Sequence, residues 1–279
     1  MAITTELEME IEGLSDVEAT IDFTNPKDFT TTFQALFYNA YSRDPTADYT
    51  VLVRGFPNKY FEANDDDQSV IPRSSSALYF RESQILLLTM RGGPHEAAAK
   101  RFSELLIMKI GRIGCFDEIH SSGEETASIG SIRKEPDASW GPSPTYVTCV
   151  VESGVSESGR RLRCDAKIWL EHEESKVSQV ITINVNRRRP EIIFSVWKRR
   201  REQQDLRESY PVRAVVDQEV RITLQAGRPV ADGMLRLSFE EIFERKPQPG
   251  TGEGDFSFSA CDLGGIARKV WSKMGFDIE

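Results

Sequence analysis

Residues 146–152 read Tyr-Val-Thr-Cys-Val-Val-Glu, a nearly continuous apolar and β-branched run that is closed by Gly154. Runs of this kind are typical of strands that are buried on both faces of a sheet. The spacing of apolar residues predicts a helix over 158–172 and a second buried strand over 177–185. A strand, a helix and a further strand in this order indicate a mixed α/β core.

The sequence before this strand predicts further parts of the core. Apolar runs over 78–80 and 85–90, separated by Arg-Glu-Ser-Gln, predict a β-hairpin. Residues 95–110 predict a helix whose core face carries Ala98, Phe102, Leu105, Leu106 and Ile110. We expect an earlier helix over 31–41, and strands near 115–119 and within 129–140.

The sequence after residue 190 predicts mainly strands and a final helix. Strands are expected over 192–196, 212–216, 220–224 and 234–239, with a short amphipathic stretch over 239–243 and an amphipathic helix over 261–274. The expected organisation is a loosely ordered acidic leader over 1–30, one domain over 31–246, a linker over 247–259 and a docked C-terminal helix over 260–279.

The sequence argues against a membrane-spanning protein and against a secreted protein. The chain has 279 residues and a formal net charge of −9, and no apolar run approaches the roughly 20 residues of a membrane helix. The acidic N-terminus lacks the order of a signal peptide. We therefore expect a cytoplasmic or nuclear protein with no membrane partner. Its four cysteines are Cys115, Cys149, Cys164 and Cys261. Their wide spacing predicts reduced thiols and argues against a zinc cage.

Charge is unevenly distributed along the chain. Residues 1–70 contain fourteen Asp or Glu and four Lys or Arg. One alternative is that the acidic leader over 1–30, which lies in this region, binds basic protein partners. A basic segment follows much later, with Glu191 as its only acid, and contains Arg187, Arg188, Arg189, Lys198, Arg199, Arg200 and Arg201. This segment could contact a nucleic-acid backbone as one surface, act as a nuclear import signal, or be a solvated face.

Carboxylates near strand ends suggest metal chemistry. Asp137 follows Glu135-Pro136 near one strand, and Glu152 ends the next. Carboxylates that converge from neighbouring strands can hold Mg²⁺ for phosphodiester hydrolysis. On the preceding helix, Glu96 lies on the flank of the apolar stripe and is the expected third ligand. His95 lies on the apolar side of that helix and is expected to be buried and hydrogen-bonded. The simpler alternative is that Asp137 turns the chain and Glu152 caps a strand.

These residues resemble the PD-(D/E)xK, or restriction-endonuclease-like, superfamily. The resemblance rests on Pro136-Asp137, Val150-Val151-Glu152 and Asp165-Ala166-Lys167, and it covers roughly residues 78–243. The run Glu-Pro-Asp-Ala-Ser-Trp at 135–140 is similar to that of restriction-endonuclease candidates and their fungal relatives. The resemblance implies an α-β-β-β-α-β core, here with an N-terminal β-hairpin and C-terminal strand and helix additions.

One position departs from that family pattern. Gly154 stands where the motif has lysine, so Lys167 on the following helix is the expected substitute. The implied activity is Mg²⁺- or Mn²⁺-dependent hydrolysis of DNA or RNA. Asp137 and Glu152 would be metal ligands, Glu96 a third or outer ligand, and Lys167 the group that orients water. The alternatives are an inactive relative that binds nucleic acid or a protein, and an interaction module that uses its acidic leader.

Overall fold

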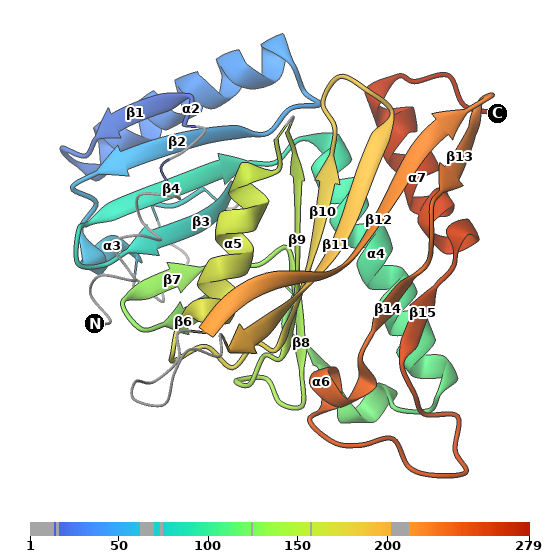
Figure 1. The fold of residues 1–279 in the computed structure, drawn as a ribbon. Helices are drawn as coiled ribbons and strands as arrows, with labels where there is room; N and C mark the ends of the chain where they lie inside the picture. Colours follow the sequence, from blue (N-terminus) through green and yellow to red (C-terminus); the bar gives the residue numbers. More distant parts are fainter. Residues whose placement is uncertain are drawn as a thin grey trace.

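The chain folds around two β-sheets. This computed structural model describes residues 14, 17–61, 70–72, 75–123, 125–156, 158–201 and 212–279. The first sheet has six strands. Strands β1 and β2 are parallel, and all other neighbouring strands of this sheet are antiparallel. Its strand order is β1 (Ala19–Asp22), β2 (Tyr49–Arg54), β4 (Ile85–Met90), β3 (Ser75–Phe80), β7 (Ile132–Lys134) and β6 (Ala127–Ile129) (Figure 1).

The second sheet has seven strands, and one of them, β9, overlaps the apolar run over 146–152. Its order is β13 (Arg228–Ala231), β12 (Val212–Gln225), β11 (Glu191–Arg201), β10 (Gln179–Val185), β9 (Cys149–Val155), β8 (Ala138–Gly141) and β5 (His120–Ser121). Strands β9 and β10 are parallel and are connected through helix α5 (Arg160–Glu171). A small third sheet pairs β14 (Leu235–Leu237) with β15 (Phe256–Phe258).

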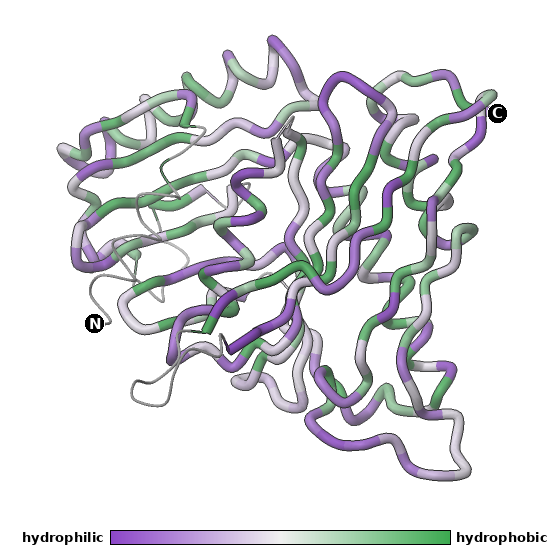
Figure 2. Tube along the Cα trace, in the orientation of Figure 1, coloured by the Kyte–Doolittle hydropathy of each residue, from purple (hydrophilic) through white to green (hydrophobic). Residues whose placement is uncertain are grey.

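Helices cover these sheets in layers. Helix α5 lies between the two sheets, where its apolar side chains pack against strands of both (Figure 1). Helix α2 (Pro26–Arg43) covers the other face of the first sheet, and α4 (Gly93–Arg112) and α7 (Ala260–Met274) cover the other face of the second. Hydrophobic residues follow the strands, while the turn between β10 and β11 is hydrophilic (Figure 2). The short helices are α3 (Asn58–Phe61), η1 (Phe116–Glu118) and α6 (Phe239–Phe243).

The start of α4 has a clear local cause. Pro94 in the first turn suits a helix start because its missing N–H would have no helical partner there. The preceding Gly92 must be glycine, since an added Cβ would lie 2.5 Å from the carbonyl oxygen of Thr46. This close approach brings the segment before β2 against the first turn of α4, and both contribute to the site described below.

The structure confirms the mixed α/β class and most of the expected elements. The hairpin is β3–β4, and the helices expected over 31–41, 95–110, 158–172 and 261–274 are α2, α4, α5 and α7. The strand expected near 115–119 is wrong, because 116–118 form the 3-10 helix η1. The two strands expected over 212–216 and 220–224 are one strand, β12.

Both ends of the chain contain more regular structure than expected. Strand β1 and the start of α2 fall within 1–30, where a loosely ordered leader was expected; residues 1–13, 15 and 16 of that leader lie outside the described residues. Strand β15 lies within the expected linker over 247–259. Among the helices of the described residues, none is both long and apolar enough to cross a membrane.

Candidate active site

The candidate site lies where the chain passes from the first sheet to the second. Strand β7 ends at Lys134, and Glu135 continues the pairing of β7 with β3. Its N–H donates to the Ala77 carbonyl at 3.0 Å, and its Oε2 accepts from the Ala77 N–H at 3.1 Å. Pro136 has no N–H to pair. Asp137 therefore stands at the point where β8 begins in the second sheet.

Asp137 is buried and surrounded by donors. Its Oδ2 accepts from the Ser153 N–H at 2.6 Å, from the Ser153 hydroxyl at 3.1 Å and from His95 Nε2 at 2.9 Å. Its Oδ1 lies 3.0 Å from Arg91 Nη2. Burial by itself would raise the pKa of Asp137, but the charges of His95 and Arg91 and the Ser153 N–H outweigh it and hold that pKa well below its usual range.

The register of β8 and β9 brings the two predicted carboxylates together. Ala138 pairs with Val151 in this antiparallel ladder. One further step of the same register places Asp137 opposite Glu152, and directly opposed side chains in antiparallel strands are close neighbours. Both side chains line the same cavity, so the structure brings these two predicted site residues together.

Glu152 is a carboxyl group with a strongly shifted pKa. Its Oε1 accepts from Trp169 Nε1 at 2.5 Å and lies 3.1 Å from Lys134 Nζ. Burial raises its pKa to about 7, and the negative charges of Asp165 and Asp137 add to that effect while Lys134 and Trp169 oppose it. Near neutral pH this group can therefore exchange a proton.

Lys134 is the cation at the centre of this site, and the sequence did not lead us to expect it there. Its Nζ lies 2.7 Å from Asp165 Oδ1 as well as 3.1 Å from Glu152 Oε1, and the residue is 4% exposed. Burial would lower its pKa, but Asp165 and Glu152 raise it overall, so the ammonium stays charged. A signal was available: Lys134 shares the buried face of β7 with Ile132, and a lysine on that face needs an acidic partner.

These groups open into one cavity of about 270 Å³. Its walls come from both sheets and from the start of α5, so it lies at the junction of three layers. Charged groups of both signs line it: Glu18, Asp48, His95, Lys134, Asp137, Glu152, Arg161, Asp165 and Arg187. Such a mixed cavity suits an ionic substrate together with a cation.

Lys167 and Glu96 lie elsewhere. On α5, Arg161 and Asp165 line the cavity, and Lys167 follows Asp165 by about 200° around the helix axis, so the structure does not bring it to this cavity. Glu96 is exposed on α4 and lines a second cavity of about 380 Å³, which also touches Asp137 but not Glu152. The helix instead directs its neighbour His95 toward Asp137.

His95 connects Asp137 to a second, partly buried acid, Asp48. His95 Nδ1 lies 2.9 Å from Asp48 Oδ2, and Asp48 also accepts from the Gly92 N–H at 2.9 Å and the Val155 N–H at 2.8 Å. Burial would lower the pKa of His95, but the charges of Asp137 and Asp48 raise it to about 10. The expectation of a buried, hydrogen-bonded histidine is confirmed; Asp48 was not anticipated, because no local pattern marks it.

We expect Asp48→Asn to destabilise the fold by about 3 kcal/mol, because it leaves the buried imidazolium of His95 with one anionic partner instead of two. The charged form of His95 stabilises the fold fully below pH 6.5, and this contribution is lost as the pH rises through about 10. Urea denaturation should therefore show the largest difference from wild type near pH 6.

Asp44→Asn is the matched control, since Asp44 forms an ion pair with Arg187 in which the two side chains are 29% and 43% exposed. Loss of that exposed pair should cost less than about 1 kcal/mol. Equal destabilisation by both substitutions would contradict the special role of the Asp48–His95 pair.

The two halves of the basic segment are separated. Residues 187–189 form the turn between β10 and β11, and Arg187 lines the cavity with its Nη2 2.9 Å from Asp44 Oδ2. Residues 198–201 lie at the far end of β11, roughly 30 Å along the strand. The alternative in which both halves form one surface is therefore not met, because the hairpin directs the two groups to opposite ends of the sheet.

A second cluster of potential metal ligands lies away from the candidate site, and ion pairing explains it. In the part of the chain that the structure describes, one set of three potential metal donors lies within 4.8 Å, formed by Cys115, Glu118 and Glu253. The Arg245 guanidinium lies 2.8 Å from both carboxylates of this set. Ion pairing with Arg245 accounts for the cluster, and none of its residues lines the candidate cavity.

Comparison with known proteins finds little that is similar. No protein-family model matches the sequence, and no curated protein matches it. Among solved structures, the crystal structure of a candidate nuclease belonging to DUF820 from Anabaena variabilis is similar with a TM-score of 0.38 and 11% identity, over 70% of this chain and 93% of that one.

Proposed function

We propose that this protein is a metal-dependent nuclease that hydrolyses phosphodiester bonds in DNA or RNA. The observation that carries the proposal is the ion pair of 3.1 Å between Lys134 and Glu152 in a cavity that Asp137 also lines. Two carboxylates and one ammonium are the groups that this reaction needs for metal binding, water orientation and charge compensation. Asp137 and Glu152 act as metal ligands in this proposal.

The residues present fit a Mg²⁺ or Mn²⁺ ion. Magnesium is commonly bound by one or two carboxylates, with water and substrate phosphate as its other ligands. Asp137 is ionised, and the pKa of Glu152 is raised partly by the negative charges of Asp165 and Asp137, so the same field would attract a cation. A bound ion would polarise the phosphate and make a coordinated water more acidic.

Lys134 takes the role that the sequence analysis proposed for Lys167. It precedes Asp137 by three residues and reaches Glu152 from β7, whereas Gly154 occupies the usual lysine position on β9. Its ammonium donates hydrogen bonds and stays charged, so it can orient an attacking water and offset charge that develops on the phosphate.

The proposal is tested with purified protein and labelled oligonucleotides. Cleavage should require Mg²⁺ or Mn²⁺, stop when a chelator is added, and resume when the metal is restored in excess. Asp137→Asn, which keeps the size of the side chain, should remove cleavage and weaken Mn²⁺ binding measured directly. A wild type that binds Mn²⁺ no better than Asp137→Asn would refute the metal site.

A specific observation favours a second function, nucleic-acid binding without hydrolysis. Both oxygens of Asp137 already contact protein donors, namely Arg91, His95 and Ser153, so a metal must share or displace these contacts. A protein of this kind would bind nucleic acid in a salt-sensitive manner and show no cleavage with any divalent ion.

The turn beside the cavity is proposed as the backbone contact. We expect the triple variant Arg187→Gln, Arg188→Gln, Arg189→Gln to weaken binding and to lower the slope of log affinity against log salt by about 1 to 2, because Arg187 lines the cavity. The matched variant changes Arg199, Arg200 and Arg201 to Gln; these lie far along β11 and should have a smaller effect. Fluorescence anisotropy between 50 and 300 mM salt compares them, and the reverse order would contradict this assignment.

A further inference from the structure

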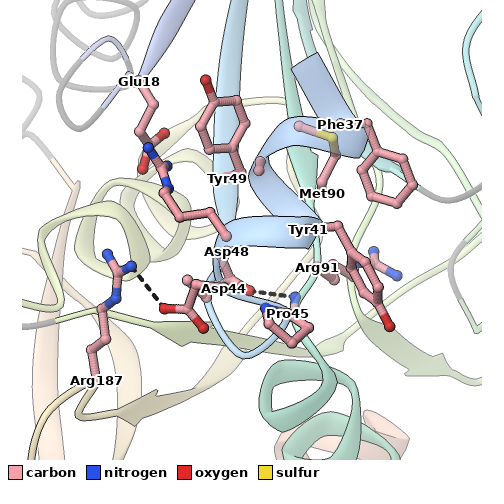
Figure 3. A pocket seen from close by; sticks show the side chains of 14 residues that line it. Glu18, Phe37, Tyr41, Asp44, Pro45, Asp48, Tyr49, Met90, Arg91 and Arg187 are labelled. Carbon is pink, nitrogen blue, oxygen red and sulfur yellow. Dashed lines mark hydrogen bonds and ion pairs between the residues drawn. The ribbon is translucent and has the colours of Figure 1, made fainter. Parts of the chain in front are cut away.

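A second, smaller recess adjoins the candidate active site and is partly aromatic. It holds about 50 Å³, and Glu18, Asp48 and Arg187 line both it and the catalytic cavity. Figure 3 shows Phe37, Tyr41 and Met90 on one side of this recess and Arg187 on the other. The nuclease chemistry proposed above does not use these aromatic residues.

Tyr41 presents an uncovered aromatic ring at this recess. It continues the apolar stripe of α2, whose earlier members Phe29 and Phe33 are buried, yet it is 59% exposed. The Phe37 ring packs beside it, with 6.0 Å between ring centroids. The neighbouring ring supports one side of Tyr41 and leaves the rest of it accessible to a planar ligand.

Arginines and carboxylates both border the same recess. Arg187 pairs with Asp44 at 2.9 Å, so a phosphate bound at Arg187 would share this arginine with that carboxylate or displace it. Arg43, in the last turn of α2, is exposed and lines it. Arg187 lies on the rim shared with the catalytic cavity, and the turn that carries it is held by Asn186 Oδ1, which accepts from the backbone N–H groups of Arg188 and Arg189 at 3.0 Å. An aromatic ring beside arginines is the combination that binds a base and its phosphate.

We propose that the substrate is a single-stranded nucleic acid, one base of which stacks on Tyr41 while the adjoining phosphate lies at Arg187. This inference rests on the proposed function and names its substrate class. The recess has room for only a few water molecules, so the base lies across its mouth against the tyrosine ring. Bases in a duplex stack on one another and offer no free face, which favours a single strand.

The test measures binding without cleavage. A fluorescent twelve-nucleotide oligothymidine is titrated with protein at low salt with a chelator present, and anisotropy is read for wild type, Tyr41→Ala, Tyr41→Phe and Tyr38→Ala. Tyr38 is the matched control, because it is 72% exposed on the same helix but does not line the recess. Tyr41→Ala should weaken binding about 5- to 150-fold, whereas Tyr41→Phe and Tyr38→Ala should change it less than twofold.

Several results would overturn the inference. These are unchanged binding by Tyr41→Ala, equal weakening by Tyr38→Ala, binding of a duplex as tight as that of the single strand, or no binding of oligothymidine by wild type. Cleavage by wild type together with normal binding by Tyr41→Ala would refute the base contact alone. Tyr41-dependent binding without metal-dependent cleavage would instead refute the nuclease and leave this binding site in place.

Discussion

Glu152→Gln should reduce metal-dependent cleavage by roughly 10³-fold, since a lost metal ligand removes several kcal/mol of transition-state stabilisation. The same substitution should stabilise the fold at pH 8 relative to wild type. Glutamine resembles the protonated acid and can still accept from Trp169 Nε1. Cleavage rates and urea denaturation at several pH values measure the two effects on one variant.

The sign of the stability effect follows from the pKa of Glu152. The unfolded chain ionises this group near pH 4.5, whereas the folded chain ionises it near pH 7. The folded state therefore binds the extra proton between these values, and wild-type stability falls as the pH rises through about 7, by about 3 kcal/mol. Glu152→Gln should lack this decrease.

Glu171→Gln is the matched control for both measurements. Glu171 has a side chain that is 7% exposed, lies on α5 and bonds to Arg213 and the Ala214 N–H, away from the cavity. It should leave cleavage unchanged. Parallel stability curves for wild type and Glu152→Gln from pH 4 to pH 9 would contradict the raised pKa, and retained cleavage would remove Glu152 from the metal site.

Replacement of Lys134 should also strongly reduce both the stability of the fold and the cleavage rate. Lys134→Met leaves Glu152 and Asp165 buried without their shared cation, so we expect a loss of about 3 to 5 kcal/mol in stability as well as loss of cleavage. A loss of that size can unfold the protein, so Lys134→Arg is the informative variant. It keeps the positive charge but replaces the compact ammonium with a planar guanidinium. We expect it to remain folded and to lose roughly 10²-fold in cleavage rate.

Lys167→Met separates the two candidate lysines. Lys167 is partly buried on α5 and does not line the cavity, so its replacement should change the cleavage rate less than about threefold. If Lys167→Met abolished cleavage while Lys134→Arg retained it, the role would belong to Lys167, as the sequence alone had indicated. Thermal unfolding of each variant excludes loss of the fold as the cause.

Local patterns predicted the main elements of this fold well. The helix face from Ala98 to Ile110 is the buried face of α4. The apolar run over 146–152 overlaps the buried strand β9, which starts at Cys149 and continues past Glu152 and Gly154 to Val155. These predictions succeed because burial on one face imposes a period of 3.6 or 2 residues on the sequence itself. The predictions fail where that signal is short, as at residues 116–118, which form a 3-10 helix instead of a strand.

The sequence also pointed to Asp137, which precedes β8, and to Glu152, which lies within β9 and not, as expected, at its end. It did not point to Lys134, Asp165 or Asp48 as their neighbours. The contact between Lys134 and Asp165 spans 31 residues, and that between Asp48 and His95 spans 47. No local period connects residues so far apart. The position of Lys134 on a buried strand face shows that it needs an acidic partner, but not which acid that is.

The sequence by itself thus determined the α/β class, the buried faces of the principal helices and strands, and the two carboxylates, one before β8 and one on β9. The tertiary structure decided which cation serves them, which acid holds His95, and which half of the basic segment lies at the cavity. The physical reason is that segment folding depends on the burial of neighbouring side chains, whereas the site forms only where two sheets meet around α5. There, charges from distant segments must pair because burial removes them from water.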